Sequence, residues 1–522
     1  MTQRHRRTFA ANAFSRALLA GALLHACGAV ADDRCAELLK LDLPNVIVDR
    51  AASTPAGQLE LPLATGMPGA KQTFDVPAFC RVAATLKPTP ASDIKIEVWL
   101  PESGWNRRFL AVGNGGWSGA IFFSSMAPAL QRGYAVAGTD TGHSGSSMDG
   151  SFAYRQPEKL VDFGWRAVHE MTVTAKRIVD AFYGAKPERS YWQGCSSGGK
   201  QGLKEAQRFP EDFDGIVAGA PAIPWTRLTS SSLAAGLASL PRGSASLLPR
   251  EKLKLVNDAV IGVCDGNDGI EDGVIEDPRT CPFDPAQITC ADPAKCLTEA
   301  QAEAVRKIYG PLRHPQTDEK LYAGFSRGSE LGWAILTSGP KPLGIALDHY
   351  RFVVFENPDW DPYTFDIARD VARADEIDAK GAQLNADDPN LDAFRQRGGK
   401  LLMYHGWSDG LIPAQSTIDY FESVLAREAG PRERALERLR QDVRLFMVPG
   451  MDHCGGGRGA NQFDALGALE RWVEHGQAPE WIEAQGTRDG TPFARKLCPY
   501  PLVARYDGRG DPNRAESFEC KE

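Results

Sequence analysis

A serine between two glycines, placed where a strand pattern turns into a helix pattern, constrains the fold of this chain most. Residues 188–193 predict a strand, Gly-x-Ser-x-Gly follows at residues 194–198, and residues 199–210 predict a helix. The flanking glycines are needed because such a turn brings the strand and helix backbones close together. The pattern therefore predicts a nucleophile elbow, in which the hydroxyl of Ser196 is exposed and the backbone N–H of Ser197 faces a substrate oxygen.

Alternating strand and helix patterns continue on both sides of this turn. Apolar residues at helical spacing mark residues 161–184. Short β-rich runs lie within residues 93–101, 107–116, 134–143, 214–221, 400–410 and 443–457. Strands that alternate with helices imply a mainly parallel sheet with helices on both faces. With the serine turn, this pattern predicts an α/β-hydrolase core.

The alternation stops after Pro221 and returns only after about Asn385. At 522 residues the chain is long for one domain, and the interrupting stretch consists of helix and loop patterns. One core with a lid-like insertion explains this arrangement better than two consecutive domains, because the strand pattern resumes afterwards. We therefore expect the core at residues 32–221 and 386–522, and the lid insertion at residues 222–385.

The first 31 residues have a different composition from the rest of the chain. Three arginines within the first seven residues precede an Ala- and Leu-rich run that ends in small residues at Ala31. This is the pattern of a secretory signal cleaved after about Ala31. Lipidation at Cys27 is the alternative, but His25 fits poorly the small residues expected before a lipidated cysteine. The chain is therefore expected to be secreted or periplasmic.

The overall charge excludes some classes of partner. The net charge of −8 and a pI near 5.7 argue against binding to nucleic acid or to an anionic membrane surface. Beyond the signal, the sequence contains no apolar run long enough to cross a bilayer. The sequence does not indicate an oligomeric state.

Two polar residues follow later strand patterns in the order that an α/β-hydrolase requires. Asp409 comes first and His453 second, each directly after a β-rich run. A serine hydroxyl is a weak nucleophile until a base removes its proton. We therefore predict that Ser196, Asp409 and His453 are the catalytic residues. Asp452 and His405 are the neighbouring alternatives.

Cysteine parity supports export and predicts a set of disulfides. The chain has 11 cysteines, and cleavage of a segment containing Cys27 leaves ten, which suggests five disulfides. Proximity in the sequence predicts the pairs Cys290–Cys296, Cys264–Cys281, Cys498–Cys520 and Cys35–Cys80. The two that remain, Cys195 and Cys454, adjoin the predicted serine and histidine. A hydrogen bond between those residues would bring the two cysteines within the roughly 4.4–6.8 Å Cα spacing of a disulfide, so we infer a Cys195–Cys454 bridge.

A glycine-rich stretch, residues 111–119, follows an early strand. An oxyanion hole needs a second N–H besides that of Ser197, and Gly115 or Gly116 is predicted to supply it. A phosphate-binding loop is the alternative. The stretch lacks the Lys-Ser/Thr or the Gly-x-x-Gly helix that such loops carry, which makes this alternative less favoured.

Cys195-Ser196, Asp409 and His453-Cys454 together resemble the tannase and feruloyl esterase family. In that family the triad serine and histidine each adjoin a cysteine of one disulfide. The resemblance extends over most of the mature chain, including the stretches FDGIVAGAP, FRQRGGKLLMYHGWSD and VPGMDHCGGG. The family also includes mono(2-hydroxyethyl) terephthalate hydrolases.

The insertion contains an acidic, glycine-rich loop, CDGNDGIEDGVIEDP. Asp265, Asp268 and Asp272 offer oxygen ligands for a hard cation, and Ile270 and Val274 could add backbone carbonyls. The loop lacks the final glutamate of an EF-hand, and a solvated acidic turn is the alternative. The family resemblance implies calcium at these positions, with a structural role, because nothing in the sequence ties the loop to the triad. The predicted Cys264–Cys281 bridge would close the loop.

The resemblance implies a serine esterase that forms an acyl-enzyme on aromatic esters, for example plant-derived feruloyl or galloyl esters. The insertion is expected to supply most of the acyl pocket and carries many aromatic residues: Trp225, Tyr309, Phe325, Trp333, Tyr350, Phe352 and Phe355. A terephthalate half-ester hydrolase is one alternative, which would need a lid cation such as Arg327 or Arg351. A secreted calcium-dependent binding protein with a vestigial triad is the other.

Overall fold

The computed structural model of the chain describes residues 34–63 and 70–522. The predicted signal at residues 1–31, with Ala31 and Cys27, lies outside the described residues. Among the described helices, none is long and apolar enough to cross a membrane.

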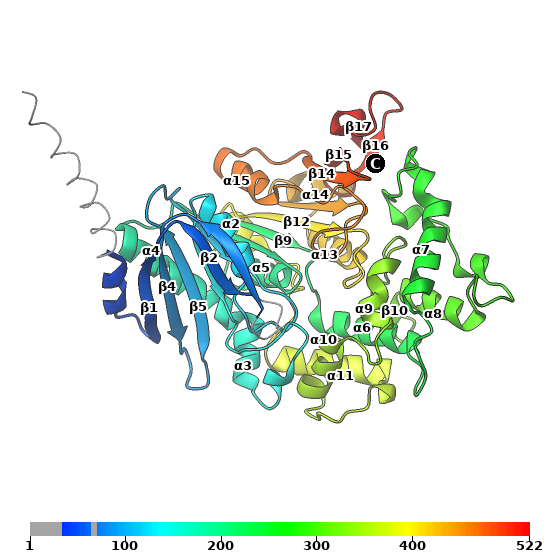
Figure 1. Cartoon of the computed structure of the whole chain (residues 1–522), viewed down its shortest axis with the longest axis horizontal. Coiled ribbons are helices and arrows are strands. Elements are labelled where there is room, and N and C mark those ends of the chain that lie inside the picture. Colours follow the sequence, from blue (N-terminus) through cyan, green and yellow to red (C-terminus); the bar gives the residue numbers. More distant parts are fainter. Residues whose placement is uncertain (1–33, 64–69) are drawn as a thin grey trace, which may run out of the picture.

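A nine-stranded sheet forms the centre of the molecule, in the order β1-β4-β5-β7-β6-β8-β9-β12-β13 (Figure 1). The strands from β7 to β13 are parallel, as the alternating pattern predicts. β1, β4 and β5 extend the sheet in antiparallel pairs, an arrangement that the pattern does not indicate. The strands are β1 Val46–Thr54, β4 Phe79–Leu86, β5 Ile94–Pro101, β6 Arg108–Val112, β7 Ala135–Thr139, β8 Arg189–Cys195, β9 Gly215–Gly219, β12 Lys400–Gly406 and β13 Val443–Val448.

Helices cover both faces of this sheet. One apolar core contains residues of α2 and α15, and a second contains residues of α4, α5 and α13. In β8, Tyr191 packs in the first core and its neighbour Trp192 in the second. Successive side chains of a strand point to opposite faces, so the middle of a central strand carries apolar side chains on both faces. The core helices are α2 Phe123–Gln131, α3 Pro157–Val161, α4 Ala167–Tyr183, α5 Ser197–Arg208, α13 Gln415–Leu425, α14 Arg432–Leu439 and α15 Ala465–His475.

Between β9 and β12 the chain leaves the sheet and forms a helical region on the side of the molecule away from β1 (Figure 1). Its buried side chains form apolar clusters of their own, around Trp333 and around Tyr350. The elements of this region are α6 Trp225–Ser239, α7 Arg250–Cys264, α8 Glu299–Tyr309, β10 Leu312–Arg313, β11 Lys320–Tyr322, α9 Ala334–Thr337, α10 Gly344–Asp348, α11 Ile367–Lys380 and α12 Asp392–Gln396.

Short hairpins and disulfides complete the fold. β2 pairs with β3, β14 with β15 and β16 with β17. Their bounds are β2 Gly57–Pro62, β3 Lys71–Val76, β14 Ile482–Arg488, β15 Thr491–Leu497, β16 Val503–Tyr506 and β17 Phe518–Lys521. Five disulfides join the same pairs that the sequence predicts: Cys35–Cys80, Cys195–Cys454, Cys264–Cys281, Cys290–Cys296 and Cys498–Cys520.

Candidate active site

Ser196 occupies the tight turn between β8 and α5. Its φ is 63° and its ψ is −124°, a conformation that residues other than glycine seldom adopt. The backbones on either side of the turn are in close contact, because a Cβ atom added to Gly194 would lie 2.5 Å from the carbonyl carbon of Gly198. The turn that exposes Ser196 therefore depends on the glycine at position 194.

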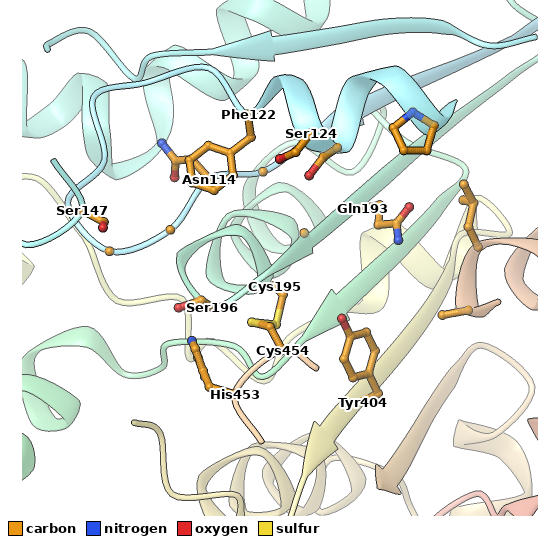
Figure 2. A pocket seen from close by; sticks show the side chains of 18 of the residues that line it. Asn114, Phe122, Ser124, Ser147, Gln193, Cys195, Ser196, Tyr404, His453 and Cys454 are labelled. Carbon is orange, nitrogen blue, oxygen red and sulfur yellow. A yellow bond between two sulfur atoms is a disulfide. The ribbon is translucent and has the colours of Figure 1, made fainter. Parts of the chain in front are cut away.

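Asp409 and His453 form a hydrogen-bonded pair beside this turn. Asp409 Oδ2 accepts a hydrogen bond from His453 Nδ1 at 2.7 Å, and its Oδ1 accepts the backbone N–H groups of Leu411 and Ile412 at 2.8 and 2.9 Å. Only 1% of Asp409 is exposed. The buried carboxylate thus fixes the histidine ring, and Figure 2 shows that ring directed toward Ser196.

The electrostatics of this pair suit a base. Burial alone would raise the pKa of Asp409, but the two imidazoles of His453 and His405, with their hydrogen bonds, hold it well below its usual range. Burial also disfavours the charged form of His453, yet the negative charge of Asp409 outweighs this effect and raises the pKa of His453. Asp409 therefore stays ionised at neutral pH and stabilises a proton gained by His453.

His405, the sequence alternative to His453, contacts the same carboxylate from behind. Its Nε2 lies 3.1 Å from Asp409 Oδ2 and 3.2 Å from the carbonyl oxygen of Ile412, and its Nδ1 lies 2.7 Å from the hydroxyl of Thr417. Its ring is fully buried and does not line the cavity in front of the serine. With the proton on Nε2, every contact is satisfied, so His405 orients Asp409. His405 lies near the end of β12, four residues before Asp409. This short spacing is the sequence signal that could have indicated its contact with the carboxylate.

The Cys195–Cys454 disulfide links the serine turn to the histidine loop. The two Cα atoms lie 5.9 Å apart, and the bond joins positions separated by 259 residues. Each cysteine is the immediate neighbour of a site residue, Ser196 on one side and His453 on the other. The disulfide therefore limits how far the serine and the histidine can separate.

The predicted oxyanion residues border the same space. Gly115 and Gly116 line the cavity together with Ser196. The hydroxyl of Ser197 donates to the carbonyl oxygen of Gly116 at 2.9 Å, which ties the glycine-rich stretch to the start of α5. Gly116 has a φ of +56°, and a Cβ atom there would lie 2.2 Å from the carbonyl oxygen of Ser147. The backbone N–H of Ser197, in the first turn of α5, has no acceptor within the helix and can serve a ligand.

A cavity of about 740 Å³ lies in front of Ser196 and His453 (Figure 2). This volume is in the range typical of ligand pockets, about 300–1,000 Å³. Its aromatic side chains are Phe122, Tyr404 and Phe463, and its polar side chains include Asn114, Ser124, Ser125, Ser147 and Gln193. Sequence reasoning missed all three aromatic residues. For Tyr404 a signal existed, because it lies near the end of the strand that precedes Asp409.

The insertion contributes little to this cavity, so the expectation that it supplies most of the acyl pocket is wrong for the cavity observed. Only Ile345 of the insertion lines it. The aromatic residues of the insertion pack elsewhere: Phe325 and Trp333 share its own apolar cluster, and the Tyr350 hydroxyl lies 2.7 Å from that of Ser230. A region of this size needs most of its aromatic residues to build its own cores. None of Trp225, Tyr309, Phe325, Trp333, Tyr350, Phe352 and Phe355 reaches the cavity.

The arginines considered for a free carboxylate are also elsewhere. Neither Arg327 nor Arg351 lines the cavity in front of the serine. The arginine that does is Arg132, and it donates to Asp464 at 3.2 Å and to Glu470 at 2.8 Å. Its charge is therefore already paired within the protein. The terephthalate half-ester alternative gains no support from these side chains.

The acidic loop is held by hydrogen bonds to its own backbone. Asp265 accepts the N–H groups of Asp272 and Val274 at 3.1 Å each, and Asp268 accepts that of Ile270 at 3.0 Å. Asp272 also pairs with two arginines of the C-terminal hairpin β14–β15, at 2.9 and 2.5 Å. These contacts fix the conformation of the loop, Asp268 and Asp272 border one small cavity, and the Cys264–Cys281 bridge closes the loop.

This loop packs against the segment that carries His453, contrary to the expectation that nothing ties it to the triad. A Cβ atom on Gly450 would lie 3.0 Å from a methyl group of Val274. Val274 and its neighbours also border a second cavity together with Asp452, the exposed alternative to Asp409. The contact arises from tertiary packing between the insertion and the core, which local sequence patterns do not reveal.

A serine at a strand–helix turn of a mainly parallel sheet, with a carboxylate-held histidine beside it, makes this chain an α/β-hydrolase. The sequence model described as "Tannase and feruloyl esterase" matches residues 80–521. The chain belongs to this family of carboxylic ester hydrolases.

Several known proteins are similar to this chain over nearly their whole length. An uncharacterized esterase of Xanthomonas campestris pv. campestris is 36% identical over 544 residues, covering 96% of this chain and 93% of that protein. A probable feruloyl esterase B-2 of Aspergillus oryzae is 36% identical over 503 residues, covering 92% and 94%. The crystal structure of feruloyl esterase B from Aspergillus oryzae matches with a TM-score of 0.85 at 32% identity, covering 94% of this chain and 100% of that one. A tannin acyl hydrolase from Aspergillus niger, 22% identical with a TM-score of 0.73, shares the fold.

Proposed function

We propose that this chain is an exported serine esterase that hydrolyses aromatic carboxylic esters through an acyl-enzyme. One observation carries the proposal: Ser196 and the Asp409-held His453 border a single cavity with aromatic walls. Similarity to probable feruloyl esterases supports the aromatic class. Five disulfides support folding in an oxidising compartment outside the cytoplasm. The alternative, a calcium-dependent binding protein with a vestigial triad, is less favoured because the chain belongs to an esterase family.

In the acylation step, Ser196 Oγ attacks the ester carbonyl carbon while His453 Nε2 takes the hydroxyl proton. The carbonyl oxygen becomes an oxyanion, and the backbone N–H of Ser197 with that of Gly115 or Gly116 stabilises it. When the tetrahedral intermediate collapses, the C–O bond to the alcohol breaks and His453 returns the proton to the leaving oxygen. Asp409 stays ionised throughout and stabilises the imidazolium.

In the deacylation step, water replaces the alcohol. His453 removes a proton from the water, which attacks the acyl-enzyme carbonyl, and the same oxyanion hole receives the negative charge. Collapse expels Ser196 Oγ, and His453 returns the proton to it. The free acid then leaves. Until it leaves, its ring lies against the aromatic walls, where face and edge contacts favour a flat ring.

Substrate preference tests the proposal directly. We expect methyl ferulate or methyl gallate to be hydrolysed with a kcat/KM at least tenfold above p-nitrophenyl esters of long-chain fatty acids, because the aromatic walls favour a ring (about 1.4 kcal/mol per tenfold). Phe122→Ala should reduce this ratio. Phe325→Ala is the control, because Phe325 belongs to the core of the insertion, and the folded fraction of this variant should keep the wild-type ratio. A clear preference for long acyl chains would refute the aromatic class.

The pH dependence of kcat/KM should show an acid limb set by His453. The neutral ring is the active base, and the charge of Asp409 raises the pKa of His453. Activity should therefore fall as the pH drops through a midpoint above the ordinary histidine value of about 6.5. Rate measurements on a neutral ester across pH 5–9 would show the limb, and His405→Gln should retain it. A midpoint well below the ordinary value would contradict the assigned base.

We also propose that the acidic loop binds a calcium ion. The residues fit: burial, and then the charges of Asp272 and Asp265, raises the pKa of Asp268 to about 6, so a cation would relieve crowded negative charge. A cavity of about 10 Å³ bordered by Asp268, Asp272 and Val274 gives room for one water-sized particle. Asp265, Asp268 and Asp272 would hold the ion, with backbone carbonyls of Ile270 and Val274. Its role would be structural.

Removal of calcium should lower the melting temperature. An ion bound only by the folded state stabilises it, and a ligand at about 100 times its Kd contributes about 2.7 kcal/mol. Because the loop packs against the segment of His453, kcat should also fall at temperatures close to unfolding. Thermal melts in EGTA, with and without added Ca²⁺, provide the measurement, and Asp268→Asn should remove the difference. If the melting curves with and without Ca²⁺ were identical and metal analysis found no calcium, the proposal would be wrong and the loop would be a solvated acidic turn.

A further inference from the structure

We propose that His169, Glu205 and Asp212 form a second metal site, for a divalent transition-metal ion of the zinc class. One potential ligand atom from each residue lies within 4.8 Å of the other two. Among the described residues, this is the one group of three His, Cys, Asp or Glu side chains gathered this closely. His169 comes from α4, Glu205 from the end of α5, and Asp212 from the turn before β9.

The environment of Glu205 is the second observation that indicates a bound cation. It is 1% exposed, and neither of its carboxylate oxygens has a hydrogen-bond partner. An ionised carboxylate buried without a partner is strongly unfavourable. Lys176 adds one positive charge nearby, but its ammonium group donates to the backbone carbonyl of Asp212 and leaves Glu205 unpaired. A cation between Glu205 and Asp212 would supply the missing partner.

The donor set points to the class of ion. One imidazole nitrogen and two carboxylate oxygens are each ligand types that zinc-class ions accept, with a water in the fourth position, whereas calcium prefers six to eight oxygens. The His169 ring stacks on Phe209 with centroids 3.8 Å apart, which fixes its plane. His169 Nδ1 lies 2.7 Å from Asp212 Oδ2, and an ion would replace the proton that they share, with the two atoms moving to the roughly 3.3 Å that tetrahedral zinc ligands span. The His169 side chain is 23% exposed, which leaves a route for an ion and its water.

A shared proton is the competing explanation. Burial, followed by the charge of Asp212, raises the pKa of Glu205 well above its ordinary value. Glu205 could then hold a proton and donate it to Asp212 without any metal. The two explanations differ in a measurable way, because only the metal site responds to added zinc or cobalt.

The position of the group predicts what a bound ion would do. Glu205 lies nine residues after Ser196 along α5, which is about 13 Å at 1.5 Å per residue. The ion would join the far end of the nucleophile's helix to α4 and to the start of β9. It would therefore stabilise the fold without touching a substrate.

Thermal stability is the first test. The mature protein is treated with EDTA, then returned to buffer with Ca²⁺ so that the acidic loop stays in one state throughout. Added Zn²⁺ should raise the melting temperature of the wild type on the order of 3 °C. Glu205→Gln and His169→Gln should lose this response, whereas His475→Gln, which alters an exposed histidine, should keep it. An equal rise in all four proteins would mean surface binding and overturn the proposal.

Spectroscopy is the second test and needs no variant that might fail to fold. Co²⁺ added to the stripped wild type should give visible absorption bands of a low-coordinate site, saturating at one ion per chain and displaced by Zn²⁺. Absence of such bands in the folded protein would overturn the proposal. If Glu205→Gln raised the melting temperature and neither metal had any effect, the shared proton would be the correct account.

Discussion

Ser196→Ala should reduce kcat by a factor on the order of 10⁴ or more, because the substitution removes the atom that forms the acyl-enzyme. The change should hardly affect the fold. It removes one oxygen from a side chain at the wall of an open cavity, and the glycine contact that shapes the turn remains. The measurement is kcat on methyl ferulate, with circular dichroism and a thermal melt to show that the protein is folded.

Ser197→Ala is the matched control for that substitution. It removes a hydroxyl one residue away, with its hydrogen bond to the carbonyl of Gly116, but keeps the backbone N–H proposed for the oxyanion hole. A loss within about tenfold is expected, since a single neutral hydrogen bond contributes about 0.5–1.5 kcal/mol. If Ser196→Ala kept more than a few per cent of the wild-type rate, the assignment of the nucleophile would be wrong.

The features that could be predicted from the sequence are those with local signals. The turn at Ser196 needs small neighbours because two backbones meet there. The five residues 194–198 therefore contain the whole signal for this turn. Asp409 and His453 follow buried strands, and parallel strands end at one edge of a sheet, so their convergence follows from their order. Four cysteine pairs follow from parity and proximity in the sequence, and the Cys195–Cys454 pair follows from this convergence.

The features that could not be predicted depend on tertiary packing. Phe122, Tyr404 and Phe463 come from three separate segments and meet only when the sheet forms. The support of Asp409 by His405 depends on where Thr417 and Ile412 lie around a fully buried ring. The antiparallel strands at one edge extend the sheet through pairing between distant segments, which strand–helix alternation does not encode.

The insertion illustrates why aromatic content is a weak guide to a pocket. A region that leaves the sheet must bury apolar surface of its own, and large rings contribute most of that area. Trp333 and Tyr350 are fully buried in this way. An aromatic residue in such a region is therefore more often part of its core than of a binding site.

Loss of the Cys195–Cys454 disulfide should lower both stability and kcat. The bond joins positions separated by 259 residues, and the chain-entropy model gives about 5.6 kcal/mol for a loop of that length. It also limits the separation of Ser196 and His453, so its loss allows geometries in which the base cannot reach the hydroxyl. The double substitution Cys195→Ala and Cys454→Ala leaves no free thiol, and thermal melts with kcat on methyl ferulate measure both effects.

Replacement of Cys290 and Cys296 by alanine is the matched control, because it removes a disulfide without touching the site. That bond joins residues only six apart, for which the same model gives about 2 kcal/mol. The control should therefore lose less stability and keep its kcat at moderate temperature. Equal losses of kcat in both variants would show that the Cys195–Cys454 bond acts only on global stability. Peptide mapping without reduction adds an independent check, since a free thiol at Cys195 or Cys454 in active enzyme would contradict the bridge itself.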